Sequence, residues 1–257
     1  MNTNLSTTEK ERYSRHLSIP EIGESGQETL KGSSVIVVGT GGLGSASAAY
    51  LAAAGVGRLG IADADSVNLS NLQRQVLHGS STLGMAKVAS AQKRLADINA
   101  EIQILPFPIH LQAQNAAEVL KDFTVVVDAT DNFESRYLLN QVCVQLGKPF
   151  VYGAIYQFYG QVSVFSADRG PCFQCVFRKQ PSQAYMQANQ GLGVVSALPG
   201  VIGSIQAVEA IKLLLGIGAP AIGRLLLYDG LDMSFQEIRA EKDPSCPICG
   251  TSSSVRN

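Results

Sequence analysis

The glycine-rich segment at residues 39–44 (GTGGLG) is the feature that most narrows the folds open to this chain. It follows a continuous apolar run at residues 33–39 (SSVIVVG) and precedes an alanine-rich stretch that extends to about residue 54. A valine-rich run is typical of a strand buried on both faces, and alanine favours helix. A buried strand that passes through glycines directly into a helix predicts the first unit of an open α/β sheet.

The remaining periodicity extends this unit into a larger sheet. Further strands are predicted at residues 57–63, 101–106, 123–128 and 148–152, and helices at residues 85–98 and 134–146. This alternation predicts right-handed crossovers between mostly parallel strands. In the second half, residues 160–166 alternate like a half-exposed strand that pairs with residues 225–228, and residues 201–215 have helical apolar spacing. We therefore expect a Rossmann-like, doubly wound, mostly parallel sheet that is extended by antiparallel strands.

The glycine spacing indicates a nucleotide site. Gly39, Gly41 and Gly44 fit the pattern G-x-G-x-x-G, which lets phosphate oxygens approach backbone N–H groups at a helix N-terminus. Asp63 lies 19 residues beyond Gly44, at the end of the next predicted strand, where a carboxylate accepts hydrogen bonds from ribose hydroxyls. The pattern leaves the nucleotide open, and NAD is its usual occupant. A glycine turn needed only for helix–strand packing is the alternative.

Polar residues beyond Asp63 favour a triphosphate ligand. Asp65 and residues 70–75 (SNLQRQ) lie just past the strand's carboxyl end, and Lys87 follows in the next predicted helix. Ligands bind along this edge of a doubly wound sheet. Arg74 as a bidentate fork and Lys87 as a mobile point charge suit phosphate recognition. Ordinary surface charge is the alternative for each of these two residues taken alone.

A second acidic group ends the fourth predicted strand, at residues 128–132 (DATDN). Asp131 carries a carboxylate to the same edge of the sheet, and Mg²⁺ prefers carboxylate oxygens together with phosphate oxygens and water. Asp131 is therefore a candidate magnesium ligand. The alternative is an N-cap for the helix that begins near Glu134, which is compatible with that role.

Four of the five cysteines form two CxxC pairs, Cys172 with Cys175 and Cys246 with Cys249, separated by 70 residues. Two such pairs in a chain of this kind predict a tetrahedral zinc site with four thiolate ligands. Such a site has no open coordination position, so we expect it to be structural and to tie the C-terminal segment to the middle of the chain. Redox-active CxxC pairs are the alternative. Cys143 is expected to be a small buried residue.

Composition argues against several other classes of protein. A net charge of -1 argues against binding to nucleic-acid phosphates, and 46% hydrophobic residues favour a large core. Residues 1–16 lack the apolar core of a secretory signal. The uncharged stretches at residues 35–57 and 191–208 contain glycine or proline, which favours buried units over membrane spans. We expect a cytoplasmic protein with no nucleic-acid or membrane partner. Three scattered histidines are expected to have structural or surface roles: His16, His78 and His110.

In combination, these motifs make the chain resemble the MoeB/ThiF/HesA family, bacterial relatives of ubiquitin-activating enzymes, and most of all its MoeB-type molybdopterin-synthase adenylyltransferases. The likeness covers nearly the whole length. The segments that carry it are ERYSRH (11–16), GTGGLG (39–44), DADSVNLSNLQRQVLH (63–78), GMAK (84–87), DATDN (128–132), GQVSVF (160–165), PCFQC (171–175), GVIGSIQAVEAIKLL (200–214) and CPIC (246–249).

The resemblance implies binding of ATP and Mg²⁺, with a structural Zn²⁺. It also implies that the C-terminal Gly-Gly carboxylate of a small ubiquitin-like sulfur carrier attacks the α-phosphate, which yields an acyl-adenylate and pyrophosphate. Sulfur transfer would then serve molybdopterin or thiamine biosynthesis. The residues expected at the ATP and magnesium site are Gly39, Gly41, Gly42, Gly44, Asp63, Asp65, Ser70, Asn71, Leu72, Gln73, Arg74, Lys87, Asp131 and Asn132.

The catalytic roles that the resemblance implies fall on four residues. Arg74 and Lys87 would neutralise charge that develops on the phosphates, as suits a reaction driven by positioning and charge stabilisation. Asp131 would bind Mg²⁺. Arg15 would reach into the active site of a second subunit, which implies a homodimer.

The sequence departs from the family pattern in two places. Residues 187–194 (QANQGLGV) contain no cysteine, although members that link covalently to their carrier have one in this region. This departure favours simple adenylylation over a thioester or acyl-disulfide step. No rhodanese domain is evident, so a separate sulfur donor is expected. The identity of the carrier and its pathway are not encoded in these motifs.

We expect one continuous domain, residues 1–257, because the sequence shows no internal repeat or low-complexity linker. Within it we distinguish an N-terminal helical arm (1–32), a nucleotide-binding half (33–155) and a carrier-binding and zinc half (156–257). Three other functions remain open. They are an NAD-dependent oxidoreductase that uses the same glycine loop, a non-catalytic zinc-containing dimer that binds a carrier, and adenylylation of a peptide or an RNA-linked carboxylate.

Overall fold

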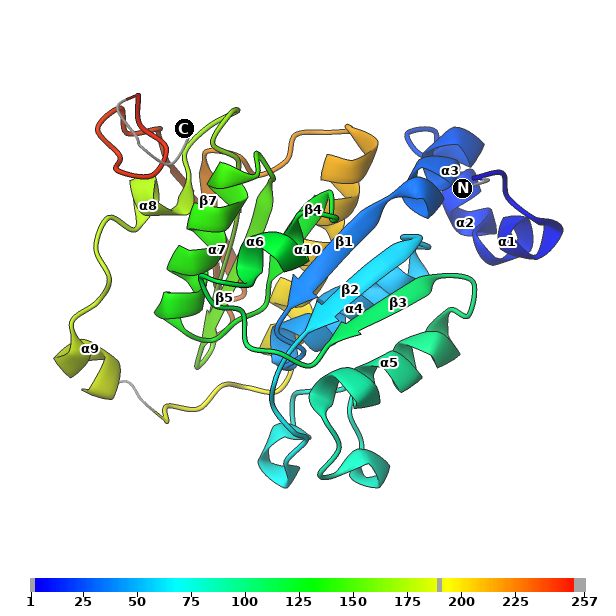
Figure 1. Cartoon of the computed structure of the whole chain (residues 1–257), viewed down its shortest axis with the longest axis horizontal. Helices are drawn as coiled ribbons and strands as arrows, with labels where there is room; N and C mark the ends of the chain where they lie inside the picture. Colours follow the sequence, from blue (N-terminus) through cyan, green and yellow to red (C-terminus); the bar gives the residue numbers. More distant parts are fainter. Residues whose placement is uncertain (1–2, 189–190, 252–257) are drawn as a thin grey trace.

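The computed structural model describes residues 3–188 and 191–251, and these form a mixed sheet of eight strands in the order β3-β2-β1-β4-β5-β6-β7-β8 (Figure 1). The strands are β1 Ser34–Val38, β2 Arg58–Ala62, β3 Gln103–Phe107, β4 Val125–Asp128, β5 Phe150–Tyr156, β6 Tyr159–Phe165, β7 Arg224–Asp229 and β8 Ser234–Arg239. Strands β1 to β5 pair in parallel, and β5 to β8 pair antiparallel. The predicted fold class is therefore confirmed.

The segment that forms the central strand β1 is apolar without interruption because both faces of this strand are buried. Its residues Val35 and Val37 belong to one core cluster, whereas Ile36 and Val38 belong to a second cluster on the other face of the sheet. Alternate side chains of a strand point to opposite faces, so a strand covered on both faces must be apolar at every position.

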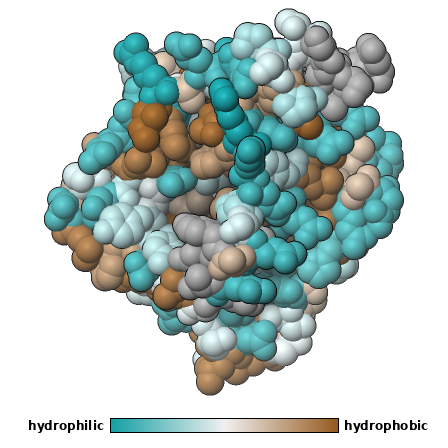
Figure 2. All heavy atoms as spheres, turned by 90° about the vertical axis from the view of Figure 1, so that its left-hand side faces the viewer, coloured by the Kyte–Doolittle hydropathy of each residue, from teal (hydrophilic) through white to brown (hydrophobic). Residues whose placement is uncertain are grey.

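Helices cover both faces of the parallel part of the sheet. Their bounds are α1 Thr7–Arg12, α2 Ser14–Leu17, α3 Gly23–Gly32, α4 Gly42–Ala53, α5 Lys87–Ile98, α6 Ala116–Leu120, α7 Phe133–Gln145, α8 Phe173–Val176, α9 Gln183–Ala188 and α10 Leu198–Leu215. Two 3₁₀ turns, η1 Leu69–Asn71 and η2 Ser80–Thr82, precede α5. Viewed from the side of α8 and α9, the surface is largely polar with scattered apolar patches (Figure 2).

The antiparallel part contains one strand that the sequence pattern did not predict. β6 pairs with β7, as expected from residues 160–166 and 225–228, but β8 follows as an additional edge strand. β8 pairs with a neighbour on one side only and is mostly exposed. Its sequence (SFQEIR) is therefore polar at several positions, and it lacks the apolar run that identifies a central strand.

By length and composition alone, α10 is apolar enough to cross a membrane, and 44% of its residues are buried inside the molecule. Its packing is that of a core helix against α4 and the sheet. A Cβ atom placed at Gly203 would lie 2.5 Å from the carbonyl oxygen of Leu43, and one placed at Gly153 would lie 2.5 Å from Gln206. Glycine at these two positions therefore lets α10 approach α4 and β5 closely.

Candidate active site and metal centre

The glycine loop lies between β1 and α4, and at Gly39 and Gly44 its backbone passes too close to neighbouring backbone atoms for a side chain. Gly39 has a φ of 94°, and a Cβ atom there would lie 2.6 Å from the carbonyl oxygen of Ala129. A Cβ atom at Gly44 would lie 1.9 Å from the carbonyl oxygen of Gly39. Gly41 is the N-cap of α4 and Gly42 its first residue, so the loop presents a helix N-terminus at the carboxyl end of β1.

Asp63, which follows β2, braces this loop. Its Oδ2 atom accepts hydrogen bonds from the Thr40 backbone N–H at 2.8 Å and from Thr40 Oγ1 at 3.0 Å. Its Oδ1 atom accepts one from the backbone N–H of Asp65 at 2.9 Å. The carboxylate expected to contact ribose thus also holds the loop that would contact the phosphates.

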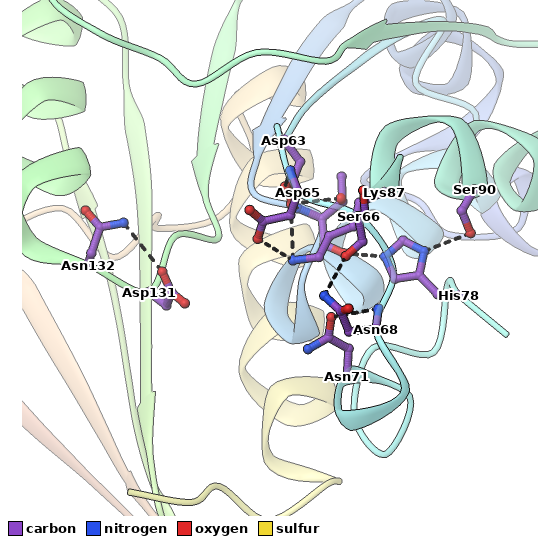
Figure 3. Close-up of polar contacts among 11 residues, drawn as sticks. Asp63, Asp65, Ser66, Asn68, Asn71, His78, Lys87, Ser90, Asp131 and Asn132 are labelled. Atoms are coloured by element: carbon purple, nitrogen blue, oxygen red, sulfur yellow. Dashed lines mark hydrogen bonds and ion pairs between the residues drawn. The ribbon is translucent and has the colours of Figure 1, made fainter. Parts of the chain in front are cut away.

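Lys87 is the first residue of α5, and it is 6% exposed. Its Nζ atom lies 2.8 Å from Asp65 Oδ2 and 4.0 Å from Asp63 Oδ2, so two carboxylates hold the ammonium group beside the glycine loop (Figure 3). A buried ammonium group is costly unless it is paired. Ordinary surface charge, the alternative for this residue, is therefore wrong.

The 70–75 segment forms η1 and the turn that follows it. Arg74 is half-buried, and its Nη1 atom donates to the carbonyl oxygen of Ser70 at 3.2 Å. Among the described residues it forms no ion pair, which leaves its charge available to an anion. Asn71 Oδ1 accepts from the backbone N–H of Asn68 at 3.3 Å. Of the other site residues expected in this segment, Leu72 is half-buried, and Ser70 and Gln73 are exposed.

Asp131 and Asn132 follow β4 and stand apart from the Asp63, Asp65 and Lys87 group in the close-up (Figure 3). Asn132 is the N-cap of α7, because its Oδ1 atom accepts from the backbone N–H of Ser135 at 2.8 Å. The alternative role of Asp131 as this cap is therefore wrong, and its exposed carboxylate is not used to begin the helix.

Beneath this turn lies a buried pair that the sequence analysis did not single out. Asp128 is fully buried, and its Oδ1 atom accepts hydrogen bonds from the backbone N–H and the hydroxyl of Thr130. Arg136 Nε lies 3.7 Å from Asp128 Oδ2, and Arg136 Nη2 donates to the carbonyl oxygen of Thr130 at 3.0 Å. Burial raises the pKa of Asp128 to about 6, although Arg136 opposes this shift. The pair shapes the turn that presents Asp131.

Arg15 lies apart from these groups within one chain. It is exposed in α2, where neighbouring His16 Nδ1 hydrogen-bonds with Gln27 Oε1 at 2.9 Å and Gln27 Nε2 donates to Ala54 O at 2.8 Å. Ala54 is the C-cap of α4, at the other end of a 12-residue helix about 18 Å long. Figure 1 shows α1–α3 beside the start of β1, opposite the glycine loop. The fold does not bring Arg15 to its own chain's site.

The two CxxC pairs meet in space although 70 residues separate them. Their Sγ atoms all lie within 4.8 Å of one another, with separations of 3.9 Å (Cys172–Cys175), 3.7 Å (Cys172–Cys246) and 3.4 Å (Cys175–Cys249). Sulfur atoms about 2.3 Å from a zinc ion form a tetrahedron with edges of about 3.8 Å. The cluster fits zinc, and the free thiols are too far apart to be disulfides.

Surrounding groups orient these sulfurs. Asn140 Nδ2 donates to Cys172 Sγ at 3.7 Å, and Asn140 Oδ1 accepts from the backbone N–H of Phe173 at 2.8 Å. Outer-shell contacts of this kind fix the direction of metal ligands. Burial raises the pKa of Cys249 to about 11. Figure 1 shows α8 and the C-terminal segment at the side of the molecule far from α5.

Comparison with protein families matches residues 13–248 to the ThiF family, which is most of the chain. The chain belongs to the ThiF family. The resemblance drawn from the sequence motifs is thereby confirmed.

Curated relatives of this ThiF-family chain carry adenylyltransferase names. It is 48% identical to the "Sulfur carrier protein adenylyltransferase" of Thermus thermophilus, over 94% of this chain and 91% of that protein. It is 45% identical to the "SAMP-activating enzyme E1" of Haloferax volcanii, over 97% and 92%. The "Adenylyltransferase and sulfurtransferase MOCS3" of Aedes aegypti is 44% identical over 98% of this chain, but the match spans only 58% of that longer protein.

Solved structures share the ThiF-family fold at lower identity. A crystal structure of E. coli MccB with ATP has a TM-score of 0.84 and 21% identity, over 96% of this chain and 76% of that one. Another, of E. coli MccB with MccA-N7isoASN, has a TM-score of 0.85 and 19% identity, over 97% of this chain and 76% of that one. At such low sequence identity, the likeness to these structures shows a shared fold and nothing more.

Proposed function

We propose that this ThiF-family chain uses ATP and Mg²⁺ to adenylylate the C-terminal Gly-Gly carboxylate of a small ubiquitin-like sulfur carrier and releases pyrophosphate. The names of the Thermus thermophilus and Haloferax volcanii relatives support this assignment, because both are similar along nearly their whole length. The name of the Aedes aegypti relative, an adenylyltransferase and sulfurtransferase, is consistent with a role in sulfur transfer. We propose molybdopterin synthesis as the pathway that is served, with thiamine synthesis as the second candidate.

The buried ammonium group of Lys87 beside the glycine loop is the observation that carries this proposal. Asp63 and Asp65 hold it in place. Asp63 also binds Thr40 of the glycine loop, and this loop leads directly into the N-terminus of α4. A fixed cation and helix N–H groups stabilise negative charge on phosphate oxygens, and they do so without reorganising during the reaction. Arg74 would add a second, more mobile cation from the 70–75 segment.

Asp131 is the proposed magnesium ligand, with Asn132 beside it. Its carboxylate is exposed and does not cap α7, and its Oδ1 atom accepts a long hydrogen bond from Asn132 Nδ2 at 3.4 Å, which leaves lone pairs that can coordinate a cation. Mg²⁺ when bound would neutralise part of the charge of the triphosphate. The four-cysteine cluster would hold Zn²⁺ as a structural centre, since all four of its positions are filled by protein thiolates.

The state of the cysteines supports direct adenylylation. All five cysteines of the sequence lie within the described residues, and all five are buried. Burial also raises the pKa of Cys143 well above its ordinary value. None of the five is placed as an exposed thiolate that could form a thioester with a carrier or carry sulfur to it. We therefore propose a separate sulfur donor, in a compartment that keeps thiols reduced, such as the cytoplasm.

The carrier is proposed to dock on the antiparallel half of the sheet. Large apolar side chains are exposed there at Tyr156, Phe158, Tyr159, Leu231, Met233, Phe235 and Ile238. Apolar side chains gathered at a sheet edge are typical of protein interaction sites. A homodimer would supply Arg15 from the second subunit, because the fold keeps this residue at the far end of its own α4.

The test is ATP–pyrophosphate exchange with the purified chain, Mg²⁺ and candidate carriers that end in Gly-Gly. We expect exchange with one carrier, its loss when the last glycine is deleted, and its loss in Lys87→Ala. ATP–pyrophosphate exchange that does not depend on a Gly-Gly end would contradict the proposal and favour a peptide or another carboxylate as the substrate. Binding of NAD(H) in place of ATP would instead favour an oxidoreductase, a reading that leaves Lys87 and Arg74 without a role.

A further inference from the structure

His78 lies behind the glycine loop, where it is 7% exposed. Its Nε2 atom is 2.9 Å from the carbonyl oxygen of Thr40, and its Nδ1 atom is 3.0 Å from Ser90 Oγ (Figure 3). The N–H of the same Thr40 is held by Asp63 at 2.8 Å. Thr40 is therefore held at both its N–H and its carbonyl oxygen, by side chains from two different segments.

The partners of His78 determine where its proton lies. A carbonyl oxygen only accepts, so Nε2 must carry the hydrogen and donate to Thr40. Burial lowers the pKa of His78, a nearby Lys87 lowers it further, and Asp63 and the Thr40 bond oppose this shift. The lowered pKa favours the neutral ring, and the Nδ1 atom lies against the Ser90 hydroxyl.

The hydroxyls behind Ser90 complete this arrangement. Ser90 Oγ and Thr82 Oγ1 are 2.9 Å apart, and Thr82 Oγ1 is 3.2 Å from the backbone nitrogen and 2.9 Å from the carbonyl oxygen of Gly79. Ser90 Oγ donates to Thr82 Oγ1, Thr82 Oγ1 donates to the carbonyl oxygen of Gly79, and the Gly79 N–H donates to Thr82 Oγ1. These bonds hold Ser90 behind the ring, so His78 is positioned on the side away from Thr40 as well as on the side facing it.

We propose that His78 is a positioning residue for nucleotide binding, which sets the direction of the Thr40–Gly41 peptide. In a trans peptide the C=O of one residue and the N–H of the next point in opposite directions. When His78 holds the Thr40 oxygen toward α5, the N–H of Gly41 must point the other way, toward the edge of the sheet where the ligand is proposed to bind. This inference rests on the proposed function, since the ligand is ATP.

The state of Gly41 supports this assignment. Its N–H has no acceptor in the part of the chain that the structure describes, whereas both polar groups of Thr40 are bonded to side chains. An orphan donor at a helix N-terminus is a typical contact for a phosphate oxygen. Behind His78 lies a cavity of about 300 Å³, whose lining includes three charged residues at its outer side: Lys93, Arg94 and Asp97. None of these three hydrogen-bonds to the ring in the described chain.

The experiment compares His78→Leu, which lacks a donor, with His78→Gln, whose amide nitrogen can reach the Nε2 position. Calorimetry would measure the Kd for ATP with Mg²⁺, and exchange kinetics would measure KM for ATP and for the carrier. We expect His78→Leu to raise both ATP constants about tenfold or more, with the carrier KM unchanged, because a buried carbonyl loses its partner. His78→Gln should retain ATP constants close to those of the parent.

Leu95→Ala is the matched control, because it opens a cavity in α5 without removing a hydrogen bond to the loop. It should lower the melting temperature and leave the ATP constants unchanged. Imidazole ¹⁵N spectra of the parent should show the Nε2–H tautomer for His78, and adding ATP should shift this signal.

Three results would overturn the inference: a parent-like ATP Kd in folded His78→Leu, an equal loss in His78→Gln, or an Nδ1–H tautomer. If the parent binds ATP but shows no carrier-dependent exchange, the proposed function fails, and the Kd comparison still decides the role of His78. If the parent binds no ATP, both proposals fall.

Discussion

Asp128 ends β4 with a carboxylate that is fully buried beside Arg136. Its pKa of about 6 lies above its ordinary value of 3.8, because burial disfavours the charged form. The folded state therefore favours the protonated carboxyl. The resulting contribution to stability is present below about pH 4 and is lost as the pH rises through about 6.

Asp128→Asn tests this contribution by replacing the protonated carboxyl with a neutral group of similar shape. We expect similar free energies of unfolding for parent and variant near about pH 4. Above about pH 7 the variant should be more stable than the parent by about 2–3 kcal/mol. Urea unfolding of both proteins at a series of pH values measures this difference. A difference that is constant with pH would contradict the assignment of the raised pKa to Asp128.

At the scale of elements, the contact between α10 and α4 positions the N-terminus of α4, which follows the glycine loop. Gly203 of α10 packs on the carbonyl oxygen of Leu43, and a Cβ atom at Gly42 would lie 2.9 Å from Pro199. The first turn of α10 thus presses against the first turn of α4. Any displacement of α10 would therefore move the helix N-terminus that is proposed to contact the phosphates.

Gly203→Ala and Gly200→Ala form a matched pair within α10. The first would place a Cβ atom 2.5 Å from Leu43 O, so we expect the free energy of unfolding to fall by roughly 1–3 kcal/mol. A Cβ atom at Gly200 meets no atom within 4 Å, and alanine there should be neutral or stabilising by up to about 1 kcal/mol. Thermal and urea unfolding measure both variants. Equal free energies of unfolding for the two variants would show that α10 can shift to accommodate the Cβ atom at position 203 without a loss of stability.

At the scale of the whole molecule, the cysteine cluster joins α8, through its N-cap Cys172 and its residue Cys175, to the C-terminal segment. Cys172→Ser should release zinc and lower the free energy of unfolding by about 3 kcal/mol or more, because structural zinc contributes folding free energy directly. Cys143→Ala is the control, since this buried thiol lies outside the cluster. Metal analysis and melting temperature measure both. Equal zinc content in Cys172→Ser and parent would refute the site.

A shared active site makes a separate prediction for the dimer. Arg15→Ala and Lys87→Ala should each be inactive as homodimers. Mixing them one to one with subunit exchange should restore roughly a quarter of the parent's pyrophosphate exchange, because half of the dimers then contain one intact site. Recovery would fail to appear if Arg15 acted in its own chain or had no catalytic role. A mixture of Lys87→Ala with Arg74→Ala, which remove two groups of the same site, provides the control without recovery.

Prediction from sequence succeeded where the fold depends on short segments. The buried strand, the glycine turn and the strand that ends before Asp63 lie where they were predicted, because tight turns and buried strands require particular residue types at fixed spacing. It was less successful at β8, whose edge position removes the apolar pattern. It also placed His78 only as structural or surface, since a single histidine leaves no periodic signal.

Local sequence was enough to predict the parallel strands, the glycine turn and the two cysteine pairs, because backbone sterics and thiolate chemistry act over a few residues. Only the tertiary structure decided that Lys87 is buried between two carboxylates, that Asn132 rather than Asp131 caps α7, and that Arg15 lies far from its own site. These contacts join residues that are distant along the chain, and their geometry depends on how helices pack on the sheet.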